Sequence, residues 1–130
     1  MNYALRIDLE RPFDEVVGLT KESLAESGFG ILTEINLKQT LKNKLDVDID
    51  EQIILGACNP GFAHKGLQTE PSLGLLLPCN VVVRHSAGVT VVEAIDPETM
   101  VTLTGNSQME PLADEVRAAL KAALDRVAAS

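Results

Sequence analysis

The sequence predicts an α+β domain in which a single, mostly antiparallel β-sheet carries helices mainly on one face. Segments that alternate apolar and polar residues, as strands do, are interspersed with segments whose apolar residues recur at helical spacing. Two of the strand-like segments are adjacent in the chain and are joined by a short loop containing glycine, which is typical of an antiparallel hairpin. The order of the elements, with these consecutive strands before a long terminal helix, indicates an α+β sandwich.

Length and composition indicate one globular domain. The 130 residues are enough for one hydrophobic core and too few for two, so we expect residues 1–130 to form a single domain. Apolar residues make up 45% of the chain, which is typical of a globular protein. Tryptophan is absent and only one tyrosine and three phenylalanines occur, so we expect neither a base-stacking platform nor an aromatic cage.

The charge and the N-terminal segment argue against several partners. Nineteen acidic and eleven basic side chains give a net charge of −8, which repels nucleic-acid phosphates and anionic lipids. We therefore expect neither nucleic acid nor a membrane as partner. The first residues lack the basic region and apolar core of a secretory signal, and no stretch reaches the ~18 apolar residues of a membrane span. We expect a cytoplasmic protein, whose two cysteines remain free thiols in that reducing compartment.

The first half of the chain predicts two strands and two helices. Residues 3–9 alternate apolar and polar side chains, which predicts a strand with one wet face. Pro12 suits the first position of a helix, whose apolar stripe continues until Gly28. A second strand is expected over 31–35, followed by a short helix that Asn36 caps.

The middle of the chain contains the most apolar strand. Residues 52–58 are largely apolar and rich in branched side chains, which predicts a central strand covered on both faces. Asn59 is expected to cap the next helix, with Pro60 in its first turn. The leucine-rich run 71–78 fits either a turn of helix or an extended connector.

The last third predicts a hairpin and a long helix. Residues 79–85 and 89–95 read as two strands joined through 86–88. Ser107 and Glu110 have the spacing of a capping box, and one apolar stripe continues from there almost to the end of the chain. This segment should form a long helix packed across the sheet.

Two runs hold both cysteines: Gly-Ala-Cys-Asn-Pro at 56–60 and Leu-Leu-Pro-Cys-Asn at 76–80. With Gly-Phe-Gly-Ile-Leu-Thr-Glu-Ile at 28–35 and His-Lys-Gly-Leu at 64–67, they resemble the bacterial and archaeal domain-of-unknown-function family 302. The resemblance covers nearly the whole chain. It implies a small α+β domain of TATA-binding-protein-like architecture, dimeric and without an assigned reaction. The positions that match its signature runs are Cys58, Asn59, Pro60, His64, Pro78, Cys79 and Asn80.

These runs supply the candidate ligand-binding residues, which are Cys58, Asn59, His64, Cys79 and Asn80. Cys58 ends a strand just before a helix N-terminus, where a thiolate is favoured. If strands 52–58 and 79–85 run antiparallel, both sulfurs can meet near His64; if the strands are parallel, the sulfurs lie at opposite ends of the sheet. The site hypothesis depends on that direction.

Three interpretations of the thiols stay open. A Cys-His-Cys group is suited to a soft metal, although its spacing differs from that of structural zinc sites and no fourth ligand is evident. A redox pair lacks the Cys-x-x-Cys spacing. Packing is the third interpretation and the favoured one, because free cysteine is commonly buried. No catalytic residue, cofactor or metal is assigned.

The preferred functional prediction is a non-catalytic module that forms a homodimer or binds a small ligand. The run 73–77 motivates it, because this run is more apolar than an exposed connector should be. The alternative is a thiol-dependent redox or metal-binding protein that uses Cys58, Cys79 and His64.

Overall fold

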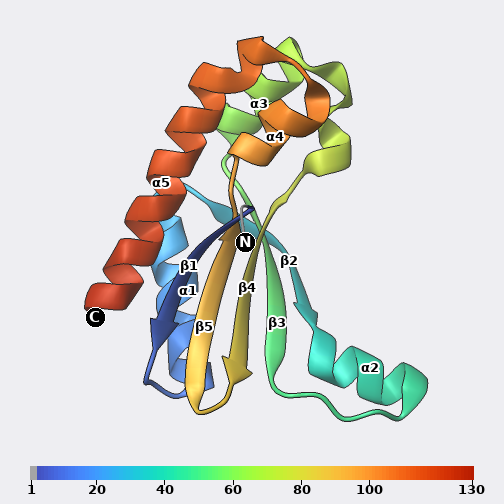
Figure 1. Cartoon of the computed structure of the whole chain (residues 1–130), viewed down its shortest axis with the longest axis vertical. Coiled ribbons are helices and arrows are strands. Elements are labelled where there is room, and N and C mark those ends of the chain that lie inside the picture. The colour runs from blue at the N-terminus through green and yellow to red at the C-terminus, as the bar shows by residue number, and fades with distance from the viewer. Residues whose placement is uncertain (1–2) are drawn as a thin grey trace.

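The computed structural model describes residues 3–130 and contains one five-stranded antiparallel sheet (Figure 1). The strands lie in the order β1-β5-β4-β3-β2, and each neighbouring pair is antiparallel. They are β1 (Ala4–Leu9), β2 (Gly30–Asn36), β3 (Gln52–Cys58), β4 (Cys79–Ser86) and β5 (Val89–Ile95). The predicted α+β class with a mostly antiparallel sheet is confirmed.

Helices occur both on one face of the sheet and beyond one of its ends. They are α1 (Phe13–Glu26), α2 (Leu37–Leu45), α3 (Pro60–Thr69), α4 (Glu98–Thr104), α5 (Glu110–Ala129) and the 3-10 helices η1 (Pro71–Leu76) and η2 (Ser107–Met109). In Figure 1, α1 and α5 cover one face, whereas α3, η1 and α4 gather above the sheet and α2 projects at the lower right. The two longest helices, α1 and α5, thus lie on one face as predicted, and the shorter helices lie beyond the ends of the sheet. Within residues 3–130, no helix is both long and apolar enough to cross a membrane.

The hydrophobic core lies between the sheet and the pair α1 and α5. Leu55 and Val81 point into it from β3 and β4, and Leu24 and Leu120 meet them from α1 and α5. All four side chains have no exposed surface. Burying each of them contributes about 1.5–3 kcal/mol relative to exposure, so this layer holds the sheet and the two helices together.

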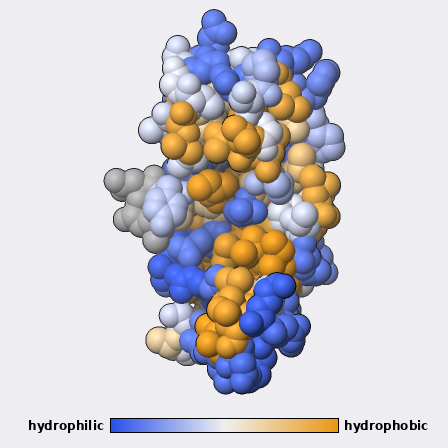
Figure 2. Space-filling model, turned by 90° about the vertical axis from the view of Figure 1, so that its right-hand side faces the viewer, coloured by the Kyte–Doolittle hydropathy of each residue, from blue (hydrophilic) through white to orange (hydrophobic). Residues whose placement is uncertain are grey.

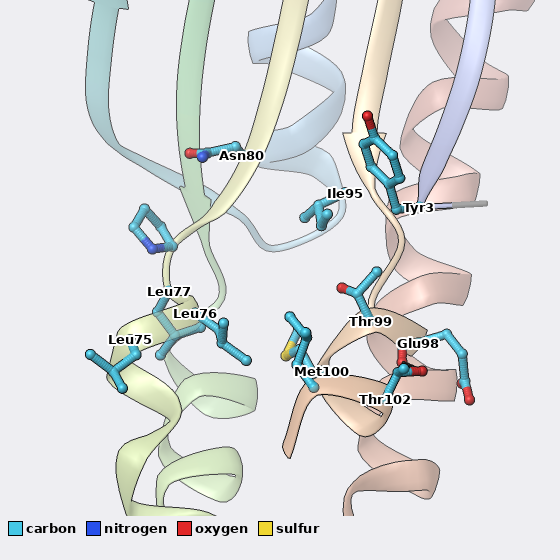
Figure 3. A pocket seen from close by; sticks show the side chains of 12 residues that line it. Tyr3, Leu75, Leu76, Leu77, Asn80, Ile95, Glu98, Thr99, Met100 and Thr102 are labelled. Carbon is cyan, nitrogen blue, oxygen red and sulfur yellow. Dashed lines mark hydrogen bonds between the residues drawn. The ribbon is translucent and has the colours of Figure 1, made fainter. Parts of the chain in front are cut away.

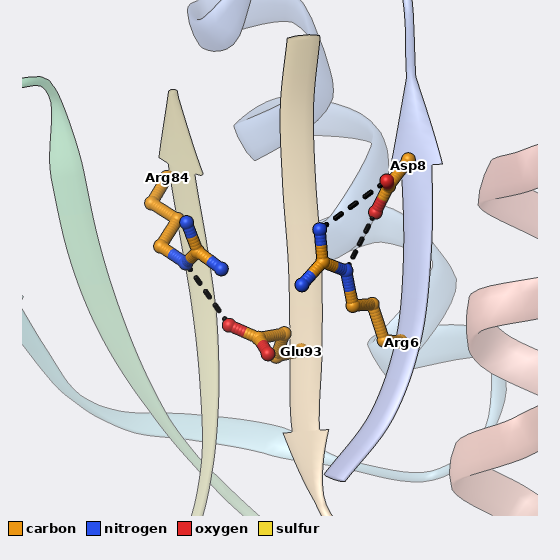
Figure 4. Close-up of polar contacts among 4 residues, drawn as sticks. All are labelled: Arg6, Asp8, Arg84 and Glu93. Atoms are coloured by element: carbon orange, nitrogen blue, oxygen red, sulfur yellow. Dashed lines mark hydrogen bonds and ion pairs between the residues drawn. The ribbon is translucent and has the colours of Figure 1, made fainter. Parts of the chain in front are cut away.

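The opposite face of the sheet is polar where it crosses β1, β5 and β4 (Figure 4). The Arg6 Nε atom lies 2.8 Å from Asp8 Oδ1, and the Arg84 Nε atom lies 3.0 Å from Glu93 Oε1. The hydrogen bond from Arg6 holds the pKa of the Asp8 carboxyl below its usual value. Because alternate residues of a strand point to opposite faces, the wet face predicted for the first strand is the one that carries these ion pairs.

Two asparagines begin helices, as the sequence predicted. The Asn36 side chain accepts a hydrogen bond from Gln39 N (3.0 Å), and the Asn59 side chain accepts one from Phe62 N (3.1 Å). Each bond satisfies a backbone donor in the first turn that has no partner within its helix.

Residues with positive φ make the predicted turns. Gly28 ends α1 with a φ of 86°. Ala87 and Gly88, with φ of 48° and 86°, form a two-residue hairpin turn between β4 and β5. The strand therefore continues one residue further than predicted, through Ser86.

The coverage of β3 differs from the prediction. The strand lies inside the sheet, but only Leu55, Gly56 and Ala57 are buried, and the first half is partly exposed. Thr33 and Pro78 lie so close to Gly56 that a side chain there would collide with them. Burial is therefore limited to the second half of β3, where Thr33 and Pro78 lie against Gly56.

The start of α5 also differs from the prediction. The expected capping box of Ser107 and Glu110 is wrong, because Asn106 accepts the hydrogen bond from Gln108 N at 3.0 Å. A 3-10 turn over residues 107–109 precedes α5, whose first residue is Glu110. The cap lies one residue earlier because the chain enters the helix through this tighter turn.

The run 71–78, which the sequence left open, is mainly helical. Residues 71–76 form η1, and an extended Leu77 then leads into β4 through a cis Leu77–Pro78 peptide bond. Leu73 is 2% exposed, whereas Leu75 is 87% exposed, so this turn buries one leucine and presents another to solvent.

Candidate functional site

Two long connections lie together above one end of the sheet. The register pairs Ala57 with Cys79 and Ala4 with Ile95, so the end of β3, the start of β4 and the end of β5 lie together. Residues 59–78 cross above this end from β3 to β4, and residues 96–109 cross it from β5 to α5 (Figure 1). The two crossings face each other.

An open cleft of about 690 Å³ separates the two crossings (Figure 3). Leu75 and Leu76 lie on one side of it, and Thr99 and Thr102 of α4 lie on the other. Its lining is mostly apolar, with the polar groups toward the sheet and α4. The apolar lining residues are Leu75, Leu76, Leu77, Pro78, Met100 and Leu103, with Ile95 at the sheet. The polar ones are Tyr3, Asn80, Glu98, Thr99 and Thr102.

Carboxylates surround the α4 edge of the cleft. Glu98, Glu110 and Asp114 are exposed, and their ligating atoms lie within 4.8 Å of one another. Partial desolvation, followed by the negative charge of Glu110, raises the pKa of Glu98. Among residues 3–130, this is the one group of three or more acidic, histidine or cysteine side chains with such spacing. Exposed carboxylates often gather without a metal, and we assign no cation here.

A second cavity of about 20 Å³ lies deeper than the cleft, between the sheet and the helices above it. Leu77 and Met100 line both spaces and so form the wall between them. Cys58 and Cys79 line the inner cavity from neighbouring strands. The antiparallel direction that the site hypothesis required is therefore present, and it brings the two cysteines to one cavity.

The two thiols have different environments. Cys79 is 5% exposed, and its burial, with a smaller contribution from Cys58, raises the pKa of its thiol to about 11. Cys58 is partly exposed at the end of β3, and both cysteines are free. Since only the thiolate is nucleophilic, Cys79 is suited to packing more than to attack on a substrate.

The other predicted site residues are divided between the two spaces. Asn59 lines the inner cavity while it caps α3, and Asn80 is exposed and lines the cleft. His64 is exposed on α3 and lines neither space. The structure thus groups Cys58 with Cys79 and leaves the imidazole apart from them.

Helix α4, which supplies much of the cleft lining, was not expected from the sequence. Its start had a recognisable signal, since an Asp-Pro-Glu sequence suits a helix N-terminus. Asp96 Oδ1 accepts a hydrogen bond from Glu98 N at 3.0 Å, and the Asp96 carbonyl accepts one from Thr99 N at 3.0 Å. The threonines and valine that follow are weak helix formers, which hid this short helix.

Comparison with known proteins agrees with this architecture. The family described as domain of unknown function DUF302 matches residues 5–127. The chain belongs to the DUF302 family. Its fold is similar to that in the crystal structure of an uncharacterized conserved DUF302 protein from Bacillus stearothermophilus, with a TM-score of 0.91 and 27% sequence identity. That similarity covers 98% of this DUF302 chain and 99% of the other one. No curated protein matches the chain.

Proposed function

We propose that this DUF302 domain is a non-catalytic binding module whose cleft takes one small, mostly apolar molecule. The cleft volume carries the proposal: about 690 Å³ is within the roughly 300–1,000 Å³ of small-molecule sites. Such sites combine apolar walls with a few polar groups that orient the ligand. Here leucines and Met100 supply the walls, and Asn80, Thr99 and Thr102 supply the polar groups.

The charges near the cleft indicate which charge its ligand can have. Glu98 lies at its edge beside Glu110 and Asp114, and the whole chain has a net charge of −8. Both the local and the overall charge repel anions. We therefore propose a neutral or positively charged amphiphilic ligand.

Two fluorescent dyes test this function. N-phenyl-1-naphthylamine is neutral, and 1-anilinonaphthalene-8-sulfonate has a similar ring system with a negative charge. We expect the neutral dye to bind one per chain and the anionic dye to bind more weakly. Tyr3 lies at the cleft and is the only tyrosine in a chain without tryptophan, so quenching of its emission reports occupancy.

A matched pair of variants locates the bound dye. Thr102→Phe places a ring in the cleft from an exposed position, and Gln108→Phe places the same ring on an exposed position outside the cleft. We expect Thr102→Phe to weaken binding of the neutral dye about tenfold or more, which corresponds to ~1.4 kcal/mol, and Gln108→Phe to leave it unchanged. Equal affinities of both variants, or no binding by the unaltered protein, would contradict the proposed function.

A homodimer is the second candidate, and the free edge of the sheet favours it. β2 is an edge strand, and Leu32 and Ile35 on it are 66% and 44% exposed. Leu45 and Val47 follow at 66% and 42%, and Figure 2 shows hydrophobic side chains over the lower part of this side. A second copy can pair its β2 antiparallel to this one about a two-fold axis.

Light scattering after size exclusion should give the mass of a dimer at micromolar concentration, and Leu32→Glu should give a monomer. The mass of one chain for the unaltered protein would refute the dimer.

A further inference from the structure

The inner cavity gathers sulfur from four elements of the fold. Cys58 of β3, Cys79 of β4, Met100 of α4 and Met109 of η2 all line it. Within residues 3–130 these are all the cysteines and methionines of the chain. Four elements of the fold thus contribute every described cysteine and methionine to the lining of one space of about 20 Å³.

The size and lining of this cavity suit a soft ion better than water. A cavity needs roughly 10–15 Å³ of such volume to hold one water molecule, so 20 Å³ has room for one small occupant. A buried water needs two to four polar partners. The lining is almost entirely apolar apart from Asn59, whose side-chain oxygen already accepts the hydrogen bond from Phe62 N. Sulfur atoms are therefore the main ligands that the cavity offers.

We propose that the inner cavity binds one Cu(I) ion through the sulfur atoms of Cys58, Cys79, Met100 and Met109. Thiolate and thioether sulfurs are soft ligands that select Cu(I), whereas Mg²⁺ and Ca²⁺ prefer oxygen. Each thiol releases its proton to solvent when it binds the ion. Cu(I) with two thiolates has one net negative charge, and the N-terminus of the ten-residue helix α3, which begins two residues after Cys58, favours that charge.

The fold also provides a way for the ion to enter. Cys58 is partly exposed, whereas Cys79, Met100 and Met109 are 5%, 7% and 1% exposed. We infer that Cys58 takes the ion first and that the three buried sulfurs complete its coordination. The surrounding hydrocarbon then excludes water, which would otherwise compete for the ion.

The test measures Cu(I) affinity of the reduced, metal-free protein by competition with bicinchoninate. We expect one Cu(I) per chain. Met100→Leu and Met109→Leu conserve side-chain volume, so both variants should keep the fold. Each should weaken Cu(I) binding about tenfold or more, because loss of a residue that only supports a ligand already weakens metal binding about tenfold. Cys58→Ser should weaken binding further. His64→Gln is the matched control and should leave the affinity unchanged, because His64 does not line the cavity.

Three results would overturn the proposal. They are the absence of stoichiometric Cu(I) binding, an affinity that neither methionine substitution changes, and an X-ray absorption spectrum with nitrogen or oxygen bound to the copper. Circular dichroism before each titration establishes that the variants are folded. The test is separate from that of the dye-binding cleft, since Met109 lines only the inner cavity and Met109→Leu should still bind the neutral dye normally.

Discussion

The contact between α3 and η1 predicts that substitutions at Gly66 and Leu73 change the free energy of unfolding in a coupled way. Gly66 is buried in α3, and a methyl group placed there would collide with the end of the Leu73 side chain and lie 3.2 Å from Leu112 Cδ2. Leu73 is 2% exposed. Gly66→Ala alone should therefore overpack this contact, and Leu73→Ala alone should leave a hole. Together, the new methyl group should occupy part of the space that Leu73 vacates.

The expected free energies of unfolding follow from these contacts. Leu73→Ala should cost about 3 kcal/mol through lost burial and the new cavity. Gly66→Ala should gain about 1 kcal/mol of helix propensity and lose about 2 kcal/mol to overpacking, a net cost of about 1 kcal/mol. Additivity would give a cost of about 4 kcal/mol for the double variant. We expect about 2 kcal/mol instead, because the collision disappears and the helix propensity remains, which is a coupling of about 2 kcal/mol.

Urea unfolding followed by far-ultraviolet circular dichroism measures the four proteins of this cycle. Gly18→Ala is the matched control, because Gly18 lies in α1 with no atom within 4 Å of the position where a methyl group would be added. Gly18→Ala should raise the free energy of unfolding by about 1 kcal/mol, whether residue 73 is leucine or alanine. Additivity of Gly66→Ala and Leu73→Ala to within about 0.5 kcal/mol would refute this account of the packing.

Three further predictions concern the thiols, the polar face and the connection before α5. In metal-free protein at about pH 8, iodoacetamide should modify Cys58 well before Cys79, whose buried thiol has a pKa of about 11; peptide mapping that found equal modification would contradict this. Glu93→Gln should lower the free energy of unfolding in urea by about 1 kcal/mol, because it removes the ion pair between Glu93 and Arg84, whose side chains are 16% and 27% exposed. An unchanged free energy of unfolding would show that this pair does not stabilise the fold. Asn106→Ala should lower the unfolding free energy by about 1–2 kcal/mol, since this side chain caps η2 and also donates hydrogen bonds to the end of α3; an unchanged urea midpoint would refute that role.

Local signals predicted most elements of this DUF302 fold, because the chemistry that sets them lies within a few residues. Asn36 and Asn59 cap the helices that follow them, and the Ala87-Gly88 turn closes the predicted hairpin. Where two adjacent residues could both cap a helix, the sequence did not show which of them does. Asn106 rather than Ser107 is the cap, since two adjacent residues can both serve and the 3-10 turn selects the earlier one.

The candidate site was predictable only in part, because it depends on strand direction and on contacts between distant segments. From the sequence we predicted that antiparallel strands would bring the two cysteines together. The strands are antiparallel, and their register pairs Ala57, the neighbour of Cys58, with Cys79. The sequence did not predict that Met100 and Met109 would line the same cavity, since helix α4 was missed and nothing local relates residue 100 to residue 58. His64 had suitable chemistry, but its position on α3 leaves it exposed.

The connections explain why the cleft and the inner cavity occur at the same end of the sheet. At the other end a two-residue turn joins β4 to β5, and α2, in the longer connection from β2 to β3, projects to the side of the sheet (Figure 1). At the end that carries the cleft, residues 59–78 and 96–109 both cross, and each connection contains a helix that cannot continue the sheet. Two such crossings enclose space between them because their helices pack on α5 and on the neighbouring 3-10 helices and only partly on each other. Met100 and Leu77 line both parts of that space and separate the larger cleft from the small inner cavity that the cysteines help to line. We therefore assign the proposed amphiphilic ligand to the cleft and the proposed ion, about the size of one water molecule, to the inner cavity, so both proposed sites depend on the same two connections.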